Sequence, residues 1–570
     1  MAQPLGAALT TIRAGQSPAS APALRVACIG GGPGGLFTAI ALSRTLPGCH
    51  VDVFERNSES DVFGFGVVFS DTTLDNVDAV DPVLRETLAA HGRRWDTIAV
   101  HSNHVTVTAG GNGMSAVHRR VLLESLRRRA AELGAHLHYD CPVTVDELDH
   151  DGYDLIVAAD GTNSAVRLQF IDDLGHTVDE ARVKFIWFGT THQFDGLTFL
   201  HERTEHGNFA VHGYPIGSGL STFIVETDEP TWRRAGLDGF DVAQPPGPSD
   251  LASQHYLEKL FGHPLVANNS RWANFRTRRT SHWHTRSAQG TPVVLLGDAV
   301  HTAHFSVGSG TKMAMEDAAA LAQSIADQPT DIPAALDRFE HTRRPQVAKV
   351  QNSAMPSLSW WDHFGEYQRA LDPWQFGFHF FSRAISAEKI RQRDPGFVAD
   401  SEEAWRSLHG TAPLDTPLHV GPRTLERRLL TLDASADEGV CLGDGRTTLR
   451  AVADGTGEAA LVTAPDTVGT ALDDRTTTAL DAVCARQPAA VVIRGGSELS
   501  RVLCSEHVRL TFGIPTIIVD QHASVRTRRA VDEIDSAATL ILSGRADAVT
   551  YEPEPAVAEH ELTSHVEAAR

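Results

Sequence analysis

Residues 24–57 decide the fold of the first part of the chain, and they read LRVACIGGGPGGLFTAIALSRTLPGCHVDVFERN. An apolar run comes first, a glycine-rich turn follows it, and apolar residues then recur at helical spacing. A second apolar run ends at an acidic residue. Strand, turn, helix and strand in this order are typical of a doubly wound α/β sheet, so we predict a Rossmann-like N-terminal domain.

The turn in this stretch has the spacing of a dinucleotide-binding motif. Gly30-x-Gly32-x-x-Gly35 is followed 20 residues later by Glu55. The first glycine permits a tight turn, the second lets the backbone approach a pyrophosphate, and the third lets helix and strand pack closely. The helix N-terminus offers N–H groups to phosphates, and Glu55 can accept hydrogen bonds from a ribose. This motif alone leaves FAD and NAD both open.

Two later motifs favour a flavin. Residues 153–167, YDLIVAADGTNSAVR, form an apolar run that ends in Asp160-Gly161. Residues 297–318, GDAVHTAHFSVGSGTKMAMEDA, follow the apolar run PVVLL and place Asp298 at a strand end. A carboxylate there can meet a ribityl hydroxyl, and Gly308 and Gly310 let backbone N–H groups approach a ring. We therefore predict bound FAD.

The histidines of the last motif raise the alternative of a metal site. His301 and His304 are three residues apart, but no cluster of further ligands accompanies them. The flavin motif explains the segment better, so we predict no metal and a structural role for His301.

The three motifs together resemble those of the single-component (class A) flavoprotein monooxygenases of the para-hydroxybenzoate hydroxylase fold. The resemblance implies a Rossmann-like FAD-binding domain, an antiparallel-sheet substrate domain, and O2 activation through a flavin C4a-hydroperoxide. NAD(P)H would bind transiently, and we expect NADH because no clamp for a 2′-phosphate is visible. The implied cofactor-binding residues are Gly30, Gly32, Pro33, Gly34, Gly35, Glu55, Arg56, Arg119, Asp160, Gly161, Asp298, Gly308, Gly310 and Thr311.

Departures from the usual family pattern indicate a particular branch. The chain has His304-Phe305 where the family usually carries a Pro-Pro pair, and Lys312 where it carries Asn. These residues, and segments such as HGNFAVHGYP (206–215) and STFIVET (221–227), resemble the branch of salicylyl-CoA 5-hydroxylase and 2-aminobenzoyl-CoA monooxygenase/reductase. The resemblance implies hydroxylation of an aromatic acyl-CoA. A tropone-carboxyl-CoA ring oxygenase, an FAD oxidase or dehydrogenase, and a non-enzymatic flavin scaffold remain as alternatives.

Candidate substrate and catalytic residues come from the same segments. We predict that four aromatic residues bind the substrate, and the alternative for each is a place in the core. Two histidines are candidate catalytic groups because imidazole titrates near neutral pH. Lys312 is a third candidate, as a pocket cation, unless it faces solvent. The substrate-binding candidates are Phe69, Trp187, Tyr214 and Phe305, and the catalytic ones are His212, His304 and Lys312. Basic runs at 270–286 and 341–349 either contact the CoA tail or form salt bridges.

The predicted domain organisation follows the motifs. It comprises a flexible tail (1–24), an FAD-binding domain (25–72, 116–182 and 286–350), a substrate domain (73–115 and 183–285), a helical segment (351–410) and a C-terminal domain (411–570). Residues 416–430 and 500–553 resemble the first strand and last βα units of an old-yellow-enzyme barrel. A complete barrel of this kind needs roughly 200 residues or more. We therefore predict a truncated α/β domain without a second flavin.

Bulk composition limits the kinds of partner that the protein is expected to bind. The formal net charge of −22 argues against nucleic acid or an anionic membrane as the main partner. The six cysteines are scattered, and no apolar stretch reaches membrane-spanning length, so we expect a cytoplasmic protein. The expected partners are a small acyl-CoA substrate and O2. The sequence leaves open whether the protein forms a homo-oligomer.

Overall fold

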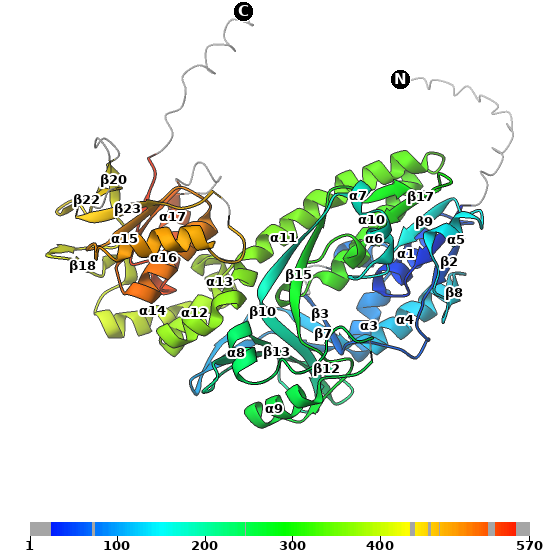
Figure 1. The fold of residues 1–570 in the computed structure, drawn as a ribbon, viewed down its shortest axis with the longest axis horizontal. Coiled ribbons are helices and arrows are strands. Elements are labelled where there is room, and N and C mark those ends of the chain that lie inside the picture. The colour runs from blue at the N-terminus through cyan, green and yellow to red at the C-terminus, as the bar shows by residue number, and fades with distance from the viewer. Residues whose placement is uncertain are drawn as a thin grey trace, which may run out of the picture.

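A computed structural model describes residues 24–70, 74–245, 247–433, 439–453, 458–466, 468–521 and 530–553. The predicted tail therefore lies, except for Leu24, outside the described residues. Figure 1 shows a large lobe that contains the N-terminal sheets and a smaller lobe that contains the C-terminal sheet, with helices between them. The α/β fold class predicted from the sequence is confirmed.

A six-stranded sheet carries the glycine motif. Its strand order is β16-β17-β9-β1-β2-β8, and all neighbours except β16 and β17 run parallel. The strands are β1 (Arg25–Ile29), β2 (His50–Phe54), β8 (His136–His138), β9 (Leu155–Ala158), β16 (His284–Arg286) and β17 (Pro292–Leu295). Apolar side chains of these strands share one core with helices α1 (Pro33–Thr45), α4 (Arg119–Glu132) and α10 (Gly310–Asp327). This is the predicted Rossmann-like arrangement.

An eight-stranded, mainly antiparallel sheet lies beside it. The order is β14-β10-β13-β12-β11-β5-β6, and β15 pairs with β10. The strands are β5 (Ile98–Ser102), β6 (Val105–Ala109), β10 (His176–Thr190), β11 (Leu197–Arg203), β12 (Asn208–Gly217), β13 (Leu220–Thr227), β14 (Leu265–Val266) and β15 (Ala273–Thr280). Strand β10 runs through the expected domain boundary at 182/183. Its hydrogen bonds to β15 continue on both sides of that point, so one ladder joins the two domains.

A small sheet closes one side of the space between the two large ones. Its order is β3-β7-β4, formed by β3 (Gly66–Ser70), β4 (Arg93–Trp95) and β7 (Met114–His118).

One long helix connects the lobes. Helix α11 (Ile332–Ala370) continues through the expected boundary at 350/351, and α12 (Pro373–Phe381), α13 (Ala387–Arg393) and α14 (Pro395–His409) follow it. Trp360, Trp361 and Phe364 of α11 pack against Phe199 of the antiparallel sheet. The long helix therefore belongs to both lobes (Figure 1).

The C-terminal lobe contains a seven-stranded sheet in sequential order. It comprises β20 (Thr431–Asp433), β21 (Gly439–Gly443), β22 (Thr448–Val452), β23 (Ala459–Thr463), β24 (Val491–Arg494), β25 (Thr516–Asp520) and β26 (Ala548–Tyr551). Helices α15 (Asp474–Cys484), α16 (Glu498–Phe512) and α17 (Ala530–Leu542) alternate with the last four strands. The N–H of Leu430 donates to the Val549 carbonyl at 2.9 Å, and the Val549 N–H donates to the Arg428 carbonyl at 2.8 Å. The sheet thus closes on itself through these residues.

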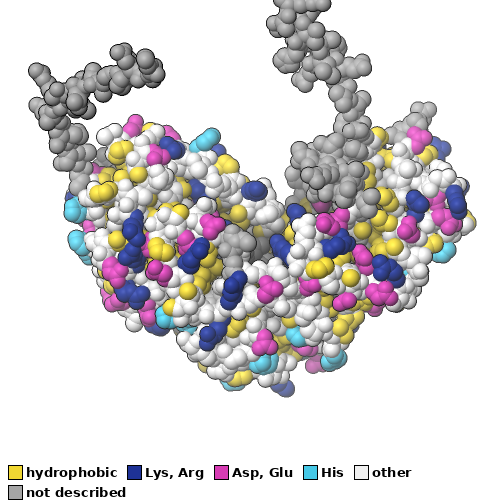
Figure 2. All heavy atoms as spheres, turned by 180° about the vertical axis from the view of Figure 1, so that it is seen from behind, with side chains coloured by type: hydrophobic (Ala, Val, Ile, Leu, Met, Phe, Trp, Pro, Cys, Tyr) yellow, Lys and Arg dark blue, Asp and Glu magenta, His cyan; other side chains and the backbone are white. Residues whose placement is uncertain are grey.

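One face of the molecule is mixed in charge. On the face in Figure 2, Lys and Arg side chains are interspersed with Asp and Glu. Within the described ranges, no helix has the length and apolar character that crossing a membrane requires.

Candidate active site

A cavity of about 770 Å³ lies between the parallel and antiparallel sheets. One end is lined by residues of the predicted flavin motifs, namely Arg119, Asp298, Gly308, Gly310 and Thr311. The other end is lined largely by aromatic and aliphatic side chains of the antiparallel sheet. We call this space the first cavity.

The glycine turn beside this cavity has the geometry that the motif predicts. A Cβ on Gly30, whose φ is 111°, would lie 2.4 Å from the Ala159 carbonyl oxygen, and one on Gly35 would lie 2.0 Å from the Gly30 carbonyl oxygen. A Cβ on Gly32 would meet nothing within 4 Å. Helix α1 begins after Gly32 with Pro33 and Gly34 and has no side-chain cap, so its first N–H groups are available to a phosphate.

Two acidic residues frame the turn. The Glu55 carboxylate accepts a hydrogen bond from the Gly31 N–H at 2.8 Å, and the neighbouring Arg56 is exposed. One oxygen of Asp160 accepts the Ala165 N–H at 2.8 Å, whereas its Oδ1 is buried without a partner among the described residues. Gly161 follows with φ at 81°. These groups fit a nucleotide whose hydroxyls would complete their hydrogen bonds.

Arg119 and Asp298 face the first cavity. The Arg119 guanidinium has no hydrogen-bond partner among the described residues, and burial lowers its pKa while Asp298 opposes that shift. The Asp298 side chain is open to the hollow of the cavity, although protein surrounds it on its other sides. That partial desolvation raises the pKa of Asp298. A cation and a carboxylate without mutual pairing fit the polar chain of a bound FAD.

His301 has a structural position. Its Nε2 lies 2.7 Å from Asp317 Oδ2, and Asp317 also accepts the Gly297 N–H at 3.0 Å and Arg343 Nε at 2.9 Å. Asp317 is buried, but these partners lower its pKa. The motif turn is therefore tied to α10 and α11. Among the described residues, no group of three or more His, Cys, Asp or Glu side chains could hold a metal ion.

The aromatic end brings together most of the predicted substrate residues. Trp187, Tyr214 and Phe305 line the cavity, and the Phe305 ring centroid lies 5.7 Å from that of Trp187 and 5.4 Å from that of His212. Trp187 Nε1 is buried without a described partner, so it is a free donor in this wall. Phe185 and Phe275, which the sequence reasoning did not single out, complete the wall. The result is a slot for a flat ring.

Two predicted site residues lie elsewhere. Phe69 is 1% exposed and packs in the core of the parallel-sheet domain, whereas Val67 and Val68 of the same strand line the cavity. Lys312 is not a cavity residue. Its Nζ lies 3.2 Å from the Glu316 carboxylate one helical turn along α10, and Glu316 also pairs with Arg343.

The two histidine candidates share a carboxylate that the sequence reasoning missed. His212 lines the first cavity, and His304 lies behind Phe305. The Nε2 atoms of His212 and His304 lie 3.6 and 3.7 Å from Glu226 Oε1, and all three side chains are at most 3% exposed. Glu226 is the one acidic residue in the otherwise apolar strand STFIVET. That isolated carboxylate is the sequence signal from which its role in the site could have been predicted.

Most of the basic runs form internal contacts. Arg276, Arg279 and Arg344 pair with Glu180, Asp179 and Glu340. The Arg271 guanidinium donates to backbone carbonyls between residues 242 and 248. A cation that was not predicted, Lys184, lines the cavity with its Nζ 4.7 Å from the centroid of the Trp232 ring.

Comparisons with known proteins agree with this site. Residues 23–354 match the family model described as FAD binding domain. The chain is 49% identical to a salicyloyl-CoA 5-hydroxylase of Streptomyces sp over 92% of its length and 99% of the relative's. It is 33% identical to a 3-hydroxy-4-methyl-anthranilyl-[aryl-carrier protein] 5-monooxygenase of Streptosporangium sibiricum over 61% of its length and 93% of the relative's. It is 32% identical to the protodeoxyviolaceinate monooxygenase of Chromobacterium violaceum over 60% of its length and 89% of the relative's. The chain therefore belongs to the FAD-binding-domain family of flavoprotein monooxygenases.

Proposed function

We propose that this monooxygenase hydroxylates the ring of an aromatic acyl thioester of the salicyloyl-CoA type at the 5-position, with NADH and O2. The observation that carries this proposal is the first cavity itself. The motif residues expected around the flavin ring line one end of it, and a flat aromatic slot with His212 lines the other. A substrate ring in the slot would face the flavin within one shared space.

The residues of the cavity suit this chemistry. Bound FAD would supply the reduced ring that activates O2. Phe305, Trp187 and Tyr214 would exclude water and hold the substrate ring in one plane. An ortho hydroxyl makes the para carbon electron-rich, and in a salicyloyl ring that carbon is position 5. Trp187 Nε1 and His212 are among the polar groups of the wall that can orient a carbonyl or hydroxyl.

The CoA or carrier arm of the substrate would extend out of the cavity through its mouth. Exposed Ala273 and Arg276 of β15 mark that mouth, with Lys184 and Trp232 beside it. A lysine near an indole offers a charge for a phosphate and a face for a base. Two relatives act, by their names, on an acyl-CoA and on a carrier-protein-bound aryl group. Both substrates need an open path for a long arm, and the cavity provides one.

Oxygen-18 labelling tests the proposal. The FAD-loaded protein is given NADH or NADPH, 18O2 and salicyloyl-CoA, with free salicylate as the matched substrate control. One labelled oxygen para to the hydroxyl of the thioester, and less product from salicylate, is the expected result. NADH consumption that yields only hydrogen peroxide would overturn ring hydroxylation of this substrate. Label entering tropone-2-carboxyl-CoA instead would favour a seven-membered ring.

A further inference from the structure

The group formed by Glu226, His212 and His304, here called the buried triad, has more polar atoms than hydrogen bonds. Both Glu226 oxygens and the Nε2 atoms of His212 and His304 are buried without a partner among the described residues. Burial raises the pKa of Glu226 well above its ordinary value, lowers that of His212 well below, and lowers that of His304 to about 3. These atoms can all form hydrogen bonds when Glu226 is a neutral acid and both imidazoles are neutral. The side chains would then move slightly closer together or be bridged by one water.

A chain of hydrogen bonds continues from the triad. The Ser306 N–H donates to His304 Nδ1 at 3.3 Å, so the ring proton of His304 is on Nε2 and points to Glu226. Ser306 Oγ lies 2.8 Å from the same Nδ1 and 3.1 Å from Ser357 Oγ, which accepts a bond from Arg383 Nε at 2.9 Å. Every hydrogen bond can form when each group donates to the next one in the series. Arg383 then donates to Ser357, Ser357 to Ser306, Ser306 to His304, and His304 toward Glu226.

The series of hydrogen bonds ends at Arg383, which lies in the wall of another cavity. A second cavity of about 560 Å³ is lined by Arg383, Lys389, Glu506 and Arg545, and by residues of α11 and α16. Exposed Ala384 and Lys389 in its wall connect it with solvent. Both lobes build it, so it exists only where the C-terminal lobe packs against α11 and α12.

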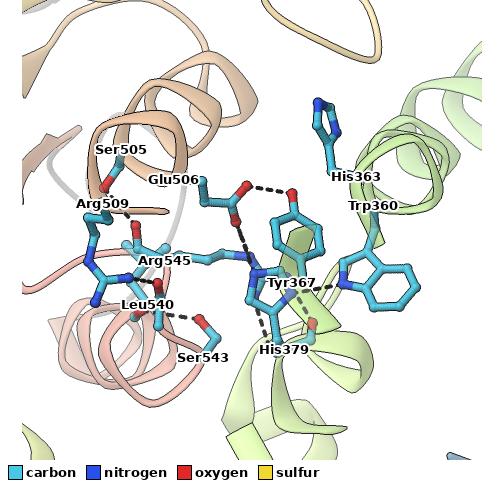
Figure 3. A network of polar contacts seen from close by, with 12 residues as sticks. Trp360, His363, Tyr367, His379, Ser505, Glu506, Arg509, Leu540, Ser543 and Arg545 are labelled. Atoms are coloured by element: carbon cyan, nitrogen blue, oxygen red, sulfur yellow. Dashed lines mark hydrogen bonds and ion pairs between the residues drawn. The ribbon is translucent and has the colours of Figure 1, made fainter. Parts of the chain in front are cut away.

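The polar wall of this second cavity is highly connected. Glu506 accepts hydrogen bonds from Tyr367 at 2.6 Å and His379 at 3.0 Å, while Trp360 donates to the other nitrogen of His379 at 2.8 Å. Arg545 donates to the His379 carbonyl at 2.8 Å. Figure 3 shows these side chains meeting from α11, α12 and the C-terminal lobe. This network joins α11, α12 and the C-terminal lobe around the second cavity, whose wall also includes Arg383.

We propose that the buried triad, with Ser306 and Ser357, is a proton path from the second cavity to the substrate end of the first. The inference rests on the proposed function. Conversion of NADH, O2, an aromatic C–H and one proton into NAD+, water and a phenol consumes that proton from solvent. The triad offers this proton a route to the first cavity that does not use the mouth. His212 is then the group that touches substrate, and Glu226 and His304 are positioning residues.

The groups that surround the triad set the pH range of such a path. Glu226 faces Asp362 of α11, and the charge of Asp362 contributes to the raised pKa of Glu226. His212 faces His201 of β11, and both His212 and His304 lie near the charge of Arg383, which lowers their pKa values. The neutral triad should therefore persist through neutral pH.

A serine pair on one helix provides a sharp test. Ser357 is in the path, whereas Ser359, two residues on, is equally buried, lines the second cavity and makes no side-chain hydrogen bond among the described residues. Chemically reduced holoenzyme is mixed with O2 without substrate, a reaction that consumes one proton per flavin in forming hydrogen peroxide. We expect Ser357→Ala to slow this step at least about tenfold and to change its solvent deuterium isotope effect. Ser359→Ala should leave both unchanged.

A second measurement needs neither FAD nor turnover. Infrared spectra of the apoprotein at neutral pH should contain a protonated carboxylic acid band that disappears in Glu226→Gln. Absence of that band from the unaltered protein, or equal rates and isotope effects in both serine variants, would overturn the proton path. Because neither assay contains an acyl thioester, failure of salicyloyl-CoA as a substrate would count only against the proposed function.

Discussion

His201 provides a quantitative test of how burial governs the charge state of this protein. It lies on β11 and is 2% exposed, and its ring centroid is 4.9 Å from that of Phe376 and 6.0 Å from that of Trp361. Both ring nitrogens are buried without a described partner. Burial lowers its pKa to about 3. We predict that His201→Phe makes the protein less sensitive to acid.

The magnitude follows from linkage. The unfolded chain binds a proton at His201 below a pKa of about 6.5, whereas the folded chain stays neutral until about 3. The unfolded state therefore binds more protons in this window, and the stability that depends on the neutral ring is lost as the pH falls. Between pH 7 and pH 5 the loss is about 1.9 kcal/mol for one such histidine, because one pKa unit corresponds to about 1.36 kcal/mol.

The assay is urea unfolding of the native chain and of His201→Phe at both pH values. The variant should lose about 1.9 kcal/mol less stability than the native chain on going from pH 7 to pH 5. Histidine NMR of the folded protein provides an independent control, since the resonance missing from the variant should not titrate above pH 5. An equal loss of stability in both proteins, or a His201 resonance that titrates near pH 6.5, would refute the reasoning.

Three further predictions concern the site and the lobe interface. Gly32→Ala should keep the stability of the apoprotein but weaken FAD binding, whereas Gly35→Ala should destabilise the apoprotein, because a Cβ there would lie 2.0 Å from a backbone carbonyl oxygen; thermal unfolding with and without FAD separates the two. Glu506→Ala should lower the urea stability by about 3–5 kcal/mol, because the buried Arg545 loses its nearby carboxylate; a loss below about 1 kcal/mol would contradict a buried charge pair. Lys312→Met should leave the KM and the ratio of product formed to NADH consumed unchanged, because the Lys312 Nζ is paired with Glu316. A large fall in that ratio would indicate that Lys312 acts in the cavity.

Local sequence was sufficient for the nucleotide fold and much of the flavin end. A glycine turn between two apolar strands is a short-range feature, since the steric demands on Gly30 and Gly35 arise from the backbone immediately around them. Aromatic residues of the resembling segments also predicted that Trp187 and Tyr214 line the cavity. The same prediction is wrong for Phe69, because residue type does not say which face of a strand is the core.

Only the tertiary structure decided the polar interior. Glu226, His212 and His304 come from three segments, and their meeting depends on the register of β12 and β13 and on the turn before α10. Lys312 occupies a motif position but bonds to its own helix, which no pattern of residue types distinguishes. The second cavity requires packing between lobes that are distant in sequence. Local sequence determined which groups this protein could use, and long-range packing decided which of them share a buried space, because desolvation acts only once the fold has closed around them.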